Sequence, residues 1–257
     1  MDIAVSTLFS LHKPLEEALP LVLEAPTKYI ELMDTGPHAL SLLRVEALLE
    51  IKETHSVEYA VHAPYTDVNI AAHDPHVREA ILRRLETSIG YASDLGAETF
   101  VFHPGNTTAL EWALPKETSW RINLESVRRL VEYAETLGVK AMIENVPEPF
   151  PFMMKSVKDF ERFYDDVGVE ILMVLDVAHA HIRDEELEFI ERFGDRIGHV
   201  HVSDNQGDRD THLQISEGSI SWEKVMGVLG DSPFDGWVTI ESHERMVKCV
   251  ELLEGFK

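Results

Sequence analysis

Short apolar runs alternate with longer amphipathic stretches along the whole chain. Pro75–Leu95 and Asn123–Leu137 carry apolar residues at the spacing of one helix face, and each ends at or beside a Leu-Gly pair, which favours a helix stop. The pattern predicts helices there and strands in eight short runs, which cover Asp2–Leu8, Lys28–Asp34, Val57–His62, Thr99–His103, Lys140–Val146, Glu170–Asp176, Ile197–Asp204 and Trp237–His243.

This alternation determines the fold class that we predict. Parallel strands need a long return connection, which a helix provides. An open doubly wound sheet would also satisfy the pattern, but eight such units in 257 residues fit a closed (β/α)8 TIM barrel better. The segment Ser6–Ser10, after the first expected strand, lacks the GxGxxG pattern of a dinucleotide fold. No linker-like run divides the chain, so we expect one α/β domain over residues 1–257.

Charge and composition narrow the choice of partners. The chain has 46 acidic and 23 basic residues, a net charge of −23, which disfavours non-specific contact with nucleic-acid phosphates. The single cysteine, Cys249, excludes a disulfide framework and a zinc site built from cysteines. No apolar run approaches the roughly 20 residues of a membrane span, and the first residues do not resemble an export signal. We therefore expect a cytoplasmic protein without a membrane partner; the sequence leaves its oligomeric state open.

The 13 histidines direct attention to the strand ends, where the active site of a TIM barrel lies. Nearly every expected strand from the third to the eighth places a metal-capable side chain at this end or in the loop that follows. Carboxylates gathered there would repel one another without cations, so we expect two or three divalent metal ions. Nitrogen and oxygen ligands without sulfur suit zinc, manganese or iron more than magnesium, and we expect zinc or manganese first among these. The candidate ligands are His62, His103, Glu144, Asp176, His179, His201, Asp210, His212 and Glu241.

The remaining histidines do not share this inference. His199 lies two residues before His201 and therefore on the same face of its strand, so we expect it one layer deeper in the barrel. Three histidines near the mouth, His73, His181 and His243, have no assigned role. Four others fall in expected loops or helix starts, where we expect them to be solvated: His12, His38, His55 and His76.

Seven short motifs in chain order resemble the xylose isomerase-like TIM-barrel superfamily, which includes sugar-phosphate isomerases and epimerases and endonuclease IV (AP endonuclease family 2). They are HAPY (62–65), FHPG (102–105), IENV (143–146), LDVAH (175–179), HVSD (201–204), DRDTHLQISEG (208–218) and TIES (239–242). The resemblance covers almost the whole chain. Its one small departure is Gln214–Gly218, where relatives tend to read PIGEG, which puts the shape of that loop in question but not the ligands.

The resemblance also implies how the ligands are divided among metal ions. By similarity to endonuclease IV, one metal would be held by His62, His103 and Glu144. A second would be held by Glu144, Asp176, His201 and Glu241, and a third by His179, Asp210 and His212. Single-metal epimerases keep only the middle set.

Two enzyme functions fit these ligands. In a sugar or sugar-phosphate isomerase or epimerase, a metal chelates adjacent oxygens of a ketose while Glu144 and Glu241 act as acid and base and His179 orients a hydroxyl group. In an endonuclease IV-like enzyme, three zinc ions would cleave the phosphodiester at an abasic site in duplex DNA, and the complete ligand set favours this alternative. A third reading, a catalytically silent barrel that only binds metal, is disfavoured because both flanking glutamates are present.

The expected mouth loops decide between the two enzymes. An endonuclease must hold the duplex backbone through basic and polar side chains. Neither Thr35–His38 nor Tyr65–Pro75 contains a lysine or an arginine. Val146–Met154 is apolar and rich in proline and phenylalanine, which is typical of a pocket wall for a small ligand. We therefore favour a small carbohydrate substrate over duplex DNA.

Overall fold

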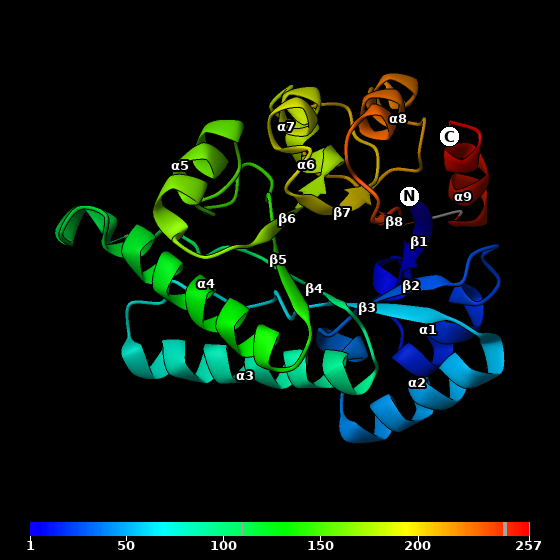
Figure 1. The fold of residues 1–257 in the computed structure, drawn as a ribbon, viewed down its shortest axis with the longest axis horizontal. Helices are drawn as coiled ribbons and strands as arrows, with labels where there is room; N and C mark the ends of the chain where they lie inside the picture. The colour runs from blue at the N-terminus through cyan, green and yellow to red at the C-terminus, as the bar shows by residue number, and fades with distance from the viewer. Residues whose placement is uncertain (109, 244–245, 257) are drawn as a thin grey trace.

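The computed structural model describes residues 1–108, 110–243 and 246–256. Among these residues, eight parallel strands pair in sequence order, and the last pairs with the first to close a barrel (Figure 1). The strands are β1 (Asp2–Ser6), β2 (Tyr29–Met33), β3 (Glu58–His62), β4 (Thr99–Phe102), β5 (Lys140–Glu144), β6 (Leu172–Asp176), β7 (Ile197–Val202) and β8 (Trp237–Ile240). The predicted (β/α)8 TIM barrel is confirmed, with a strand in each of the eight runs.

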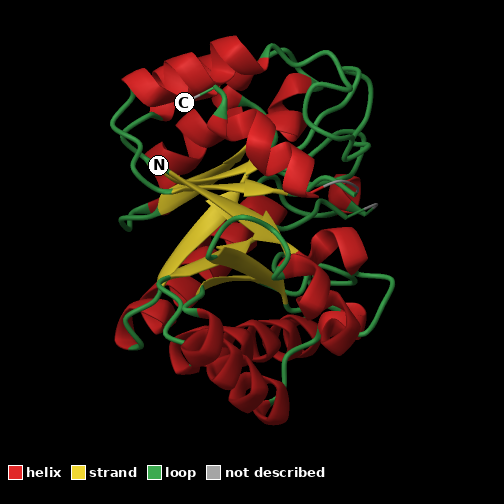
Figure 2. Cartoon of the chain, turned by 90° about the vertical axis from the view of Figure 1, so that its right-hand side faces the viewer, coloured by secondary structure: helices red, strands yellow, loops and turns green. Residues whose placement is uncertain are grey.

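Helices surround the barrel (Figure 2). In the described part of the chain they are α1 (Leu15–Val22), α2 (Leu42–His55), α3 (Pro75–Asp94), α4 (Thr118–Thr136), α5 (Val157–Val167), α6 (Val177–His181), α7 (Glu186–Phe193), α8 (Trp222–Asp231) and α9 (Met246–Glu254), with short 3-10 helices η1 (Thr7–Ser10), η2 (Gly36–His38) and η3 (Glu111–Ala113). No helix among these residues is long and apolar enough to cross a bilayer.

The two helices predicted from periodicity are present. Both Leu-Gly stops are confirmed, because Gly96 and Gly138 have φ values of +64° and +71°, a left-handed conformation that glycine adopts without strain. However, α4 begins at Thr118, five residues before the predicted start at Asn123. Its first turn contains Thr118 and Ser119, which are weak helix formers and hide the helical spacing in the sequence.

Side-chain alternation along the strands separates two apolar layers. Side chains such as Phe100 and Phe102 belong to the large core between the barrel and the helices. Val101, Met142 and Val174 form a separate small cluster, which alternation places inside the barrel. Above this inner cluster, toward the carboxyl ends of the strands, buried titratable side chains occupy the interior.

One prediction about the histidines is wrong. His38 is fully buried rather than solvated, because η2 packs against η1 and brings His38 Nδ1 to 3.3 Å from Thr7 Oγ1. Burial lowers the pKa of the His38 imidazole. The other three histidines expected in solvent, His12, His55 and His76, are exposed.

Candidate active site

A cavity of about 290 Å³ opens at the carboxyl ends of the strands. Seven of the nine candidate ligands line it: His62, His103, Glu144, His179, Asp210, His212 and Glu241. The other two, Asp176 and His201, are completely buried and contact residues that line the cavity. The structure therefore brings all nine predicted residues together.

Glu144 is at the centre of the cluster. Its Oε2 lies 3.3 Å from His62 Nε2 and 3.0 Å from His103 Nε2, and its Oε1 lies 3.2 Å from His201 Nδ1. Burial disfavours an ionised carboxylate, but the charges of His201 and His103 outweigh burial and hold the pKa of Glu144 well below its ordinary value. Glu144 is therefore an anion that several imidazoles share.

A second group forms around His201. One ligand atom from each of Glu144, Asp176, His201 and Glu241 lies within 4.8 Å of all the others. Burial, together with the charges of Glu144, Asp210 and Glu241, raises the pKa of Asp176 to about 7. Asp176 Oδ2 and Glu241 Oε1 are buried without a hydrogen-bond partner. Because an unpaired buried carboxylate oxygen is costly, this group fits a divalent cation that would use those oxygens as ligands.

A third group forms around Asp210. Its Oδ2 lies 3.4 Å from His179 Nε2 and 3.0 Å from His212 Nε2. Burial alone would disfavour the charged imidazoles, but Asp176 and Asp210 raise the pKa of His179 to about 10, and Asp210 raises that of His212 to about 9. His179 Nδ1–H donates to the carbonyl oxygen of Asn145 at 2.8 Å, which directs Nε2 toward Asp210.

Hydrogen bonds at the strand ends hold these groups in place. The Asn145 side chain donates to the carbonyl oxygen of Asp176 at 3.0 Å and accepts from its N–H at 2.8 Å, which joins the ends of β5 and β6. Asp176 Oδ1 then accepts from the backbone N–H of His179 at 2.7 Å and caps α6. Two neighbouring ligands thus depend on one asparagine.

The loop after β7 is held by Asp204. Its carboxylate accepts from the N–H groups of Ser216 and Ile220 and from Trp222 Nε1. A Cβ at Gly218 would lie 2.1 Å from Asp204 Oδ1, so this position requires glycine. The departure from PIGEG within this loop leaves His212 in the cluster.

Sequence reasoning missed Glu31. It is completely buried in β2, with Oε2 2.9 Å from His199 Nε2 and both oxygens 3.2 Å from His201 Nε2. His199 lies below His201, as predicted. The available signal was a glutamate within an apolar strand, between Ile30 and Leu32, whose side chains belong to the outer core. Alternation therefore turns Glu31 into the barrel.

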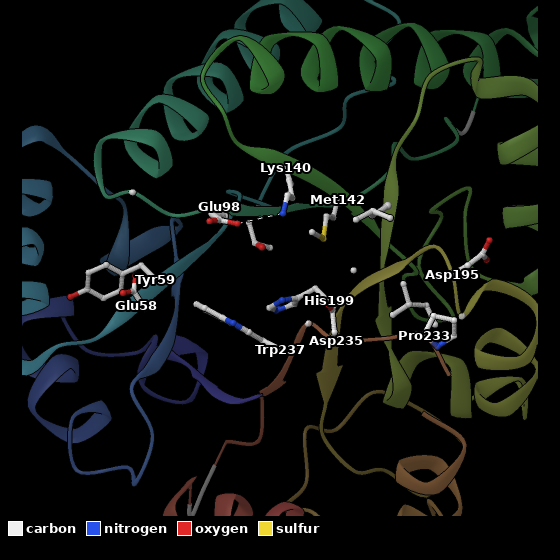
Figure 3. A pocket seen from close by; sticks show the side chains of 17 residues that line it. Glu58, Tyr59, Glu98, Lys140, Met142, Asp195, His199, Pro233, Asp235 and Trp237 are labelled. Carbon is white, nitrogen blue, oxygen red and sulfur yellow. Dashed lines mark hydrogen bonds and ion pairs between the residues drawn. The ribbon is translucent and has the colours of Figure 1, made fainter. Parts of the chain in front are cut away.

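A second hollow, of about 490 Å³, lies at the amino ends of the strands (Figure 3). His199, Trp237 and Met142 are among the side chains that line it. Its Lys140 pairs with Glu98 at 3.4 Å. The convergent ligands gather at the opposite end, so the smaller cavity is the candidate active site.

One wall of the active-site cavity is apolar, as Val146–Met154 predicted. Pro147, Phe150 and Phe152 line it, and the Phe152 ring packs edge-on against His103 with a centroid distance of 5.7 Å. None of the described residues that line the cavity is lysine or arginine. Of the histidines without an assigned role, His73 and His181 contact Ser119 and Glu186 and do not line the cavity, whereas the His243 ring packs against His212.

A family model described as "Xylose isomerase-like TIM barrel" matches residues 19–255. The chain belongs to the xylose isomerase-like TIM-barrel family. The resemblance carried by the seven motifs is thereby confirmed.

Several known proteins are similar to this chain over most of their length. MJ1311 of Methanocaldococcus jannaschii, an uncharacterized protein, is 30% identical over 100% of this chain and 89% of that protein. Fructoselysine 3-epimerase of Shigella flexneri is 23% identical over 95% of this chain and 92% of its own. A crystal structure of a D-tagatose 3-epimerase-like protein superposes with a TM-score of 0.93 at 29% identity, covering 100% of this chain and 97% of the other. The IOLI protein, crystallised with a zinc atom, has the same fold, with a TM-score of 0.78, 19% identity and coverage of 100% and 96%.

Proposed function

We propose that this protein is a metal-dependent sugar epimerase or isomerase that acts on an unphosphorylated ketose. The observation that carries the proposal is the pair of buried carboxylates, Glu144 from β5 and Glu241 just beyond β8, which line one small cavity beside a cation-compatible cluster. Relatives named fructoselysine 3-epimerase and D-tagatose 3-epimerase-like protein support a ketose substrate.

We propose that Glu144, Asp176, His201 and Glu241 hold the principal metal ion. The unpaired oxygens of Asp176 and Glu241 support this assignment, and the zinc atom of the IOLI protein supports zinc beside manganese as the metal. The groups around His62 and His103 and around His179, Asp210 and His212 are the proposed sites for a second and a third ion. When bound, the ion polarises the substrate carbonyl and stabilises the negative charge that develops on its oxygen.

The two glutamates perform the proton transfer in this proposal. One glutamate, as the carboxylate, removes the proton from the carbon beside the carbonyl group, and the other, as the carboxylic acid, delivers its proton to the opposite face of the same carbon, which inverts it. His179, whose ring lines the cavity, orients a substrate hydroxyl group. Phe150 and Phe152 exclude water from the reacting carbon.

The lining of the cavity supports an uncharged sugar. A phosphate dianion is usually bound by arginine, lysine or several backbone N–H groups. The described lining offers no lysine or arginine and contains the carboxylates Glu144, Asp210 and Glu241. Near the mouth, Arg183 is already paired with Glu148 and Glu185. A ketose phosphate would therefore find no lysine or arginine in this lining and would face three carboxylates.

Abasic-site endonuclease activity is the second candidate, because the structure gathers all three ligand groups of the endonuclease IV pattern. Against it, the described lining has no lysine or arginine to hold a duplex backbone, and the chain has a net charge of −23. We therefore rank it below the ketose.

The test is turnover of a ketose panel, each sugar with its phosphate ester, by the protein loaded with manganese or zinc. Proton NMR in D2O detects exchange at the inverted carbon. Both Glu144→Gln and Glu241→Gln are expected to lower kcat about 100- to 10,000-fold without unfolding the barrel. The matched control is Glu186→Gln, a buried glutamate that pairs with His181 and does not line the cavity; its turnover is expected to be unchanged. Full activity in Glu241→Gln would remove the proposed role of Glu241, and nicking of abasic duplex without ketose turnover would favour the endonuclease.

A further inference from the structure

Glu31 is a buried carboxylate at the centre of the barrel, below the proposed active site. Its side chain is 0% exposed, and its ion-pair partners among the described residues are His199 and His201. Nothing in the proposed proton transfer uses it. A buried carboxylate needs partners, and Glu31 has them mainly through Oε2, which contacts both imidazoles; Oε1 makes no hydrogen bond and has only its 3.2 Å ion-pair contact with His201.

The two ring nitrogens of His201 face different partners. Nδ1 points into the proposed metal cluster, 3.2 Å from Glu144 Oε1 and 3.7 Å from Glu241 Oε2. Nε2 points the other way, 3.2 Å from both oxygens of Glu31. A carboxylate accepts but does not donate, so Nε2 carries the hydrogen. In a neutral ring, Nδ1 then presents its lone pair to the cluster, as a metal ligand must.

Glu31 is itself held from its other side. His199 Nε2 lies 2.9 Å from Glu31 Oε2 and 2.8 Å from Thr239 Oγ1 on β8. Figure 3 shows the His199 ring among the side chains that line the second hollow, at the amino ends of the strands. His199 lies in β7, two residues before His201. Glu31 therefore joins β2 to β7 and cannot turn away from His201 without losing its contact with His199.

We propose that Glu31 is a positioning residue that sets the metal affinity of the site by fixing the tautomer and the ring orientation of His201. The carboxylate acts through His201 and touches no substrate. This inference rests on one part of the proposed function, namely that Glu144, Asp176, His201 and Glu241 bind a metal ion. Loss of such an outer carboxylate typically weakens metal binding about 10- to 100-fold.

The competing reading is that Glu31, His199 and His201 form a metal site themselves, since their ligand atoms also lie within 4.8 Å of one another. In that case His201 would present Nε2 to a lower ion instead of donating a hydrogen bond to Glu31. The two readings differ in the number of ions bound. If Glu31 only positions His201, its loss weakens binding of the ion at Glu144, Asp176, His201 and Glu241; if Glu31, His199 and His201 bind an ion themselves, the protein holds one ion more.

The test is titration of the full-length, metal-free protein with Co²⁺, followed by visible absorption and by competition with a chelator. The variant is Glu31→Gln, which offers one acceptor oxygen in place of two and turns an amide N–H toward an imidazole. Its Kd for Co²⁺ is expected to rise about 10- to 100-fold. The matched control is Asp34→Asn, another buried carboxylate, just beyond β2, which contacts Arg84 and Ser88; its Kd is expected to be unchanged.

Should Glu31→Gln not fold, Glu31→Asp provides the same measurement, because it keeps the charge but is too short to maintain both contacts. An unchanged Kd in the folded variant would overturn the positioning role. Loss of one bound ion with unchanged affinity for the rest would overturn it in favour of the lower metal site. Failure of the unaltered protein to bind Co²⁺ would instead overturn the proposed function, and this inference with it.

Discussion

Protons and metal ions are expected to compete for the group around Asp210. In the metal-free protein, burial disfavours the protonated rings, but Asp176 and Asp210 raise the pKa of His179 to about 10 and Asp210 raises that of His212 to about 9. Both rings are therefore protonated at neutral pH. A histidine binds a metal ion only in its unprotonated form, so an ion that binds there has to displace two protons.

The size of this effect follows from the pKa values. One pKa unit corresponds to about 1.4 kcal/mol, so deprotonation at pH 7 costs about 4 kcal/mol at His179 and about 3 kcal/mol at His212. Displacing two protons changes the Kd by up to about 100-fold per pH unit below pH 9. Metal binding at this group should therefore be much tighter at pH 8.5 than at pH 6.5.

The assay is calorimetric titration with chelator-buffered zinc at pH 6.5, 7.5 and 8.5, in buffers of different ionisation enthalpy so that released protons are counted. The control is His212→Gln, which removes one titrating ring and should reduce the slope to about tenfold per pH unit. A zinc Kd at this group that does not depend on pH would refute the reasoning.

The raised pKa values of His179 and His212 also determine how the stability of the fold depends on pH. A histidine whose folded pKa is raised above the ordinary 6.5 stabilises the fold fully below pH 6.5 and loses that contribution as the pH rises through the folded value. The melting temperature of the metal-free protein should therefore fall between pH 7 and 10. With zinc bound, these rings carry no proton, so the fall should be smaller. A flat profile for the metal-free protein would contradict the electrostatic account of this group.

Two further predictions concern the backbone that supports the site. In Gly105→Ala the new Cβ would lie 2.5 Å from Ala71 Cβ, so the free energy of unfolding measured with denaturant should fall by about 1–3 kcal/mol. The control is Gly227→Ala in α8, where nothing lies within 4 Å of the new Cβ and no destabilisation is expected; equal effects of the two substitutions would refute the steric argument. Asp204→Asn removes one acceptor oxygen from the loop that carries His212, which should weaken the proposed metal site at Asp210. Elemental analysis after dialysis should then show loss of the ion at Asp210 and retention of the ion at Glu144; loss of neither ion would contradict the role of Asp204.

The sequence predicted the barrel and the strand-end cluster because both depend on periodic features. Alternation of strands and helices determines the topology, and the ends of parallel strands meet at one rim, so His62 and Glu241 could be brought together although 179 positions separate them. The resemblance to the family added the division into ligand groups, which remains a proposal.

Features that depend on contacts between distant segments were not predicted. Glu31 lies inside a strand rather than at its end, and only closure of the barrel reveals that it faces His201. His38 follows a polar turn that is typical of a solvated loop, yet it is buried against Thr7, 31 positions away. The early start of α4 was hidden for a local reason, since Thr118 and Ser119 carry no helical signal.

The inner cluster of Val101, Met142 and Val174 has a consequence for catalysis by this barrel. Because these apolar side chains fill the channel below Glu144, a sugar cannot pass through to the hollow at the opposite end. In the proposed epimerase, substrate and product would therefore enter and leave by the same opening, beside Phe150 and Phe152. If Glu144 and Glu241 act as proposed, exchange of sugar through that one opening sets an upper limit on turnover, however fast the proton transfer itself is.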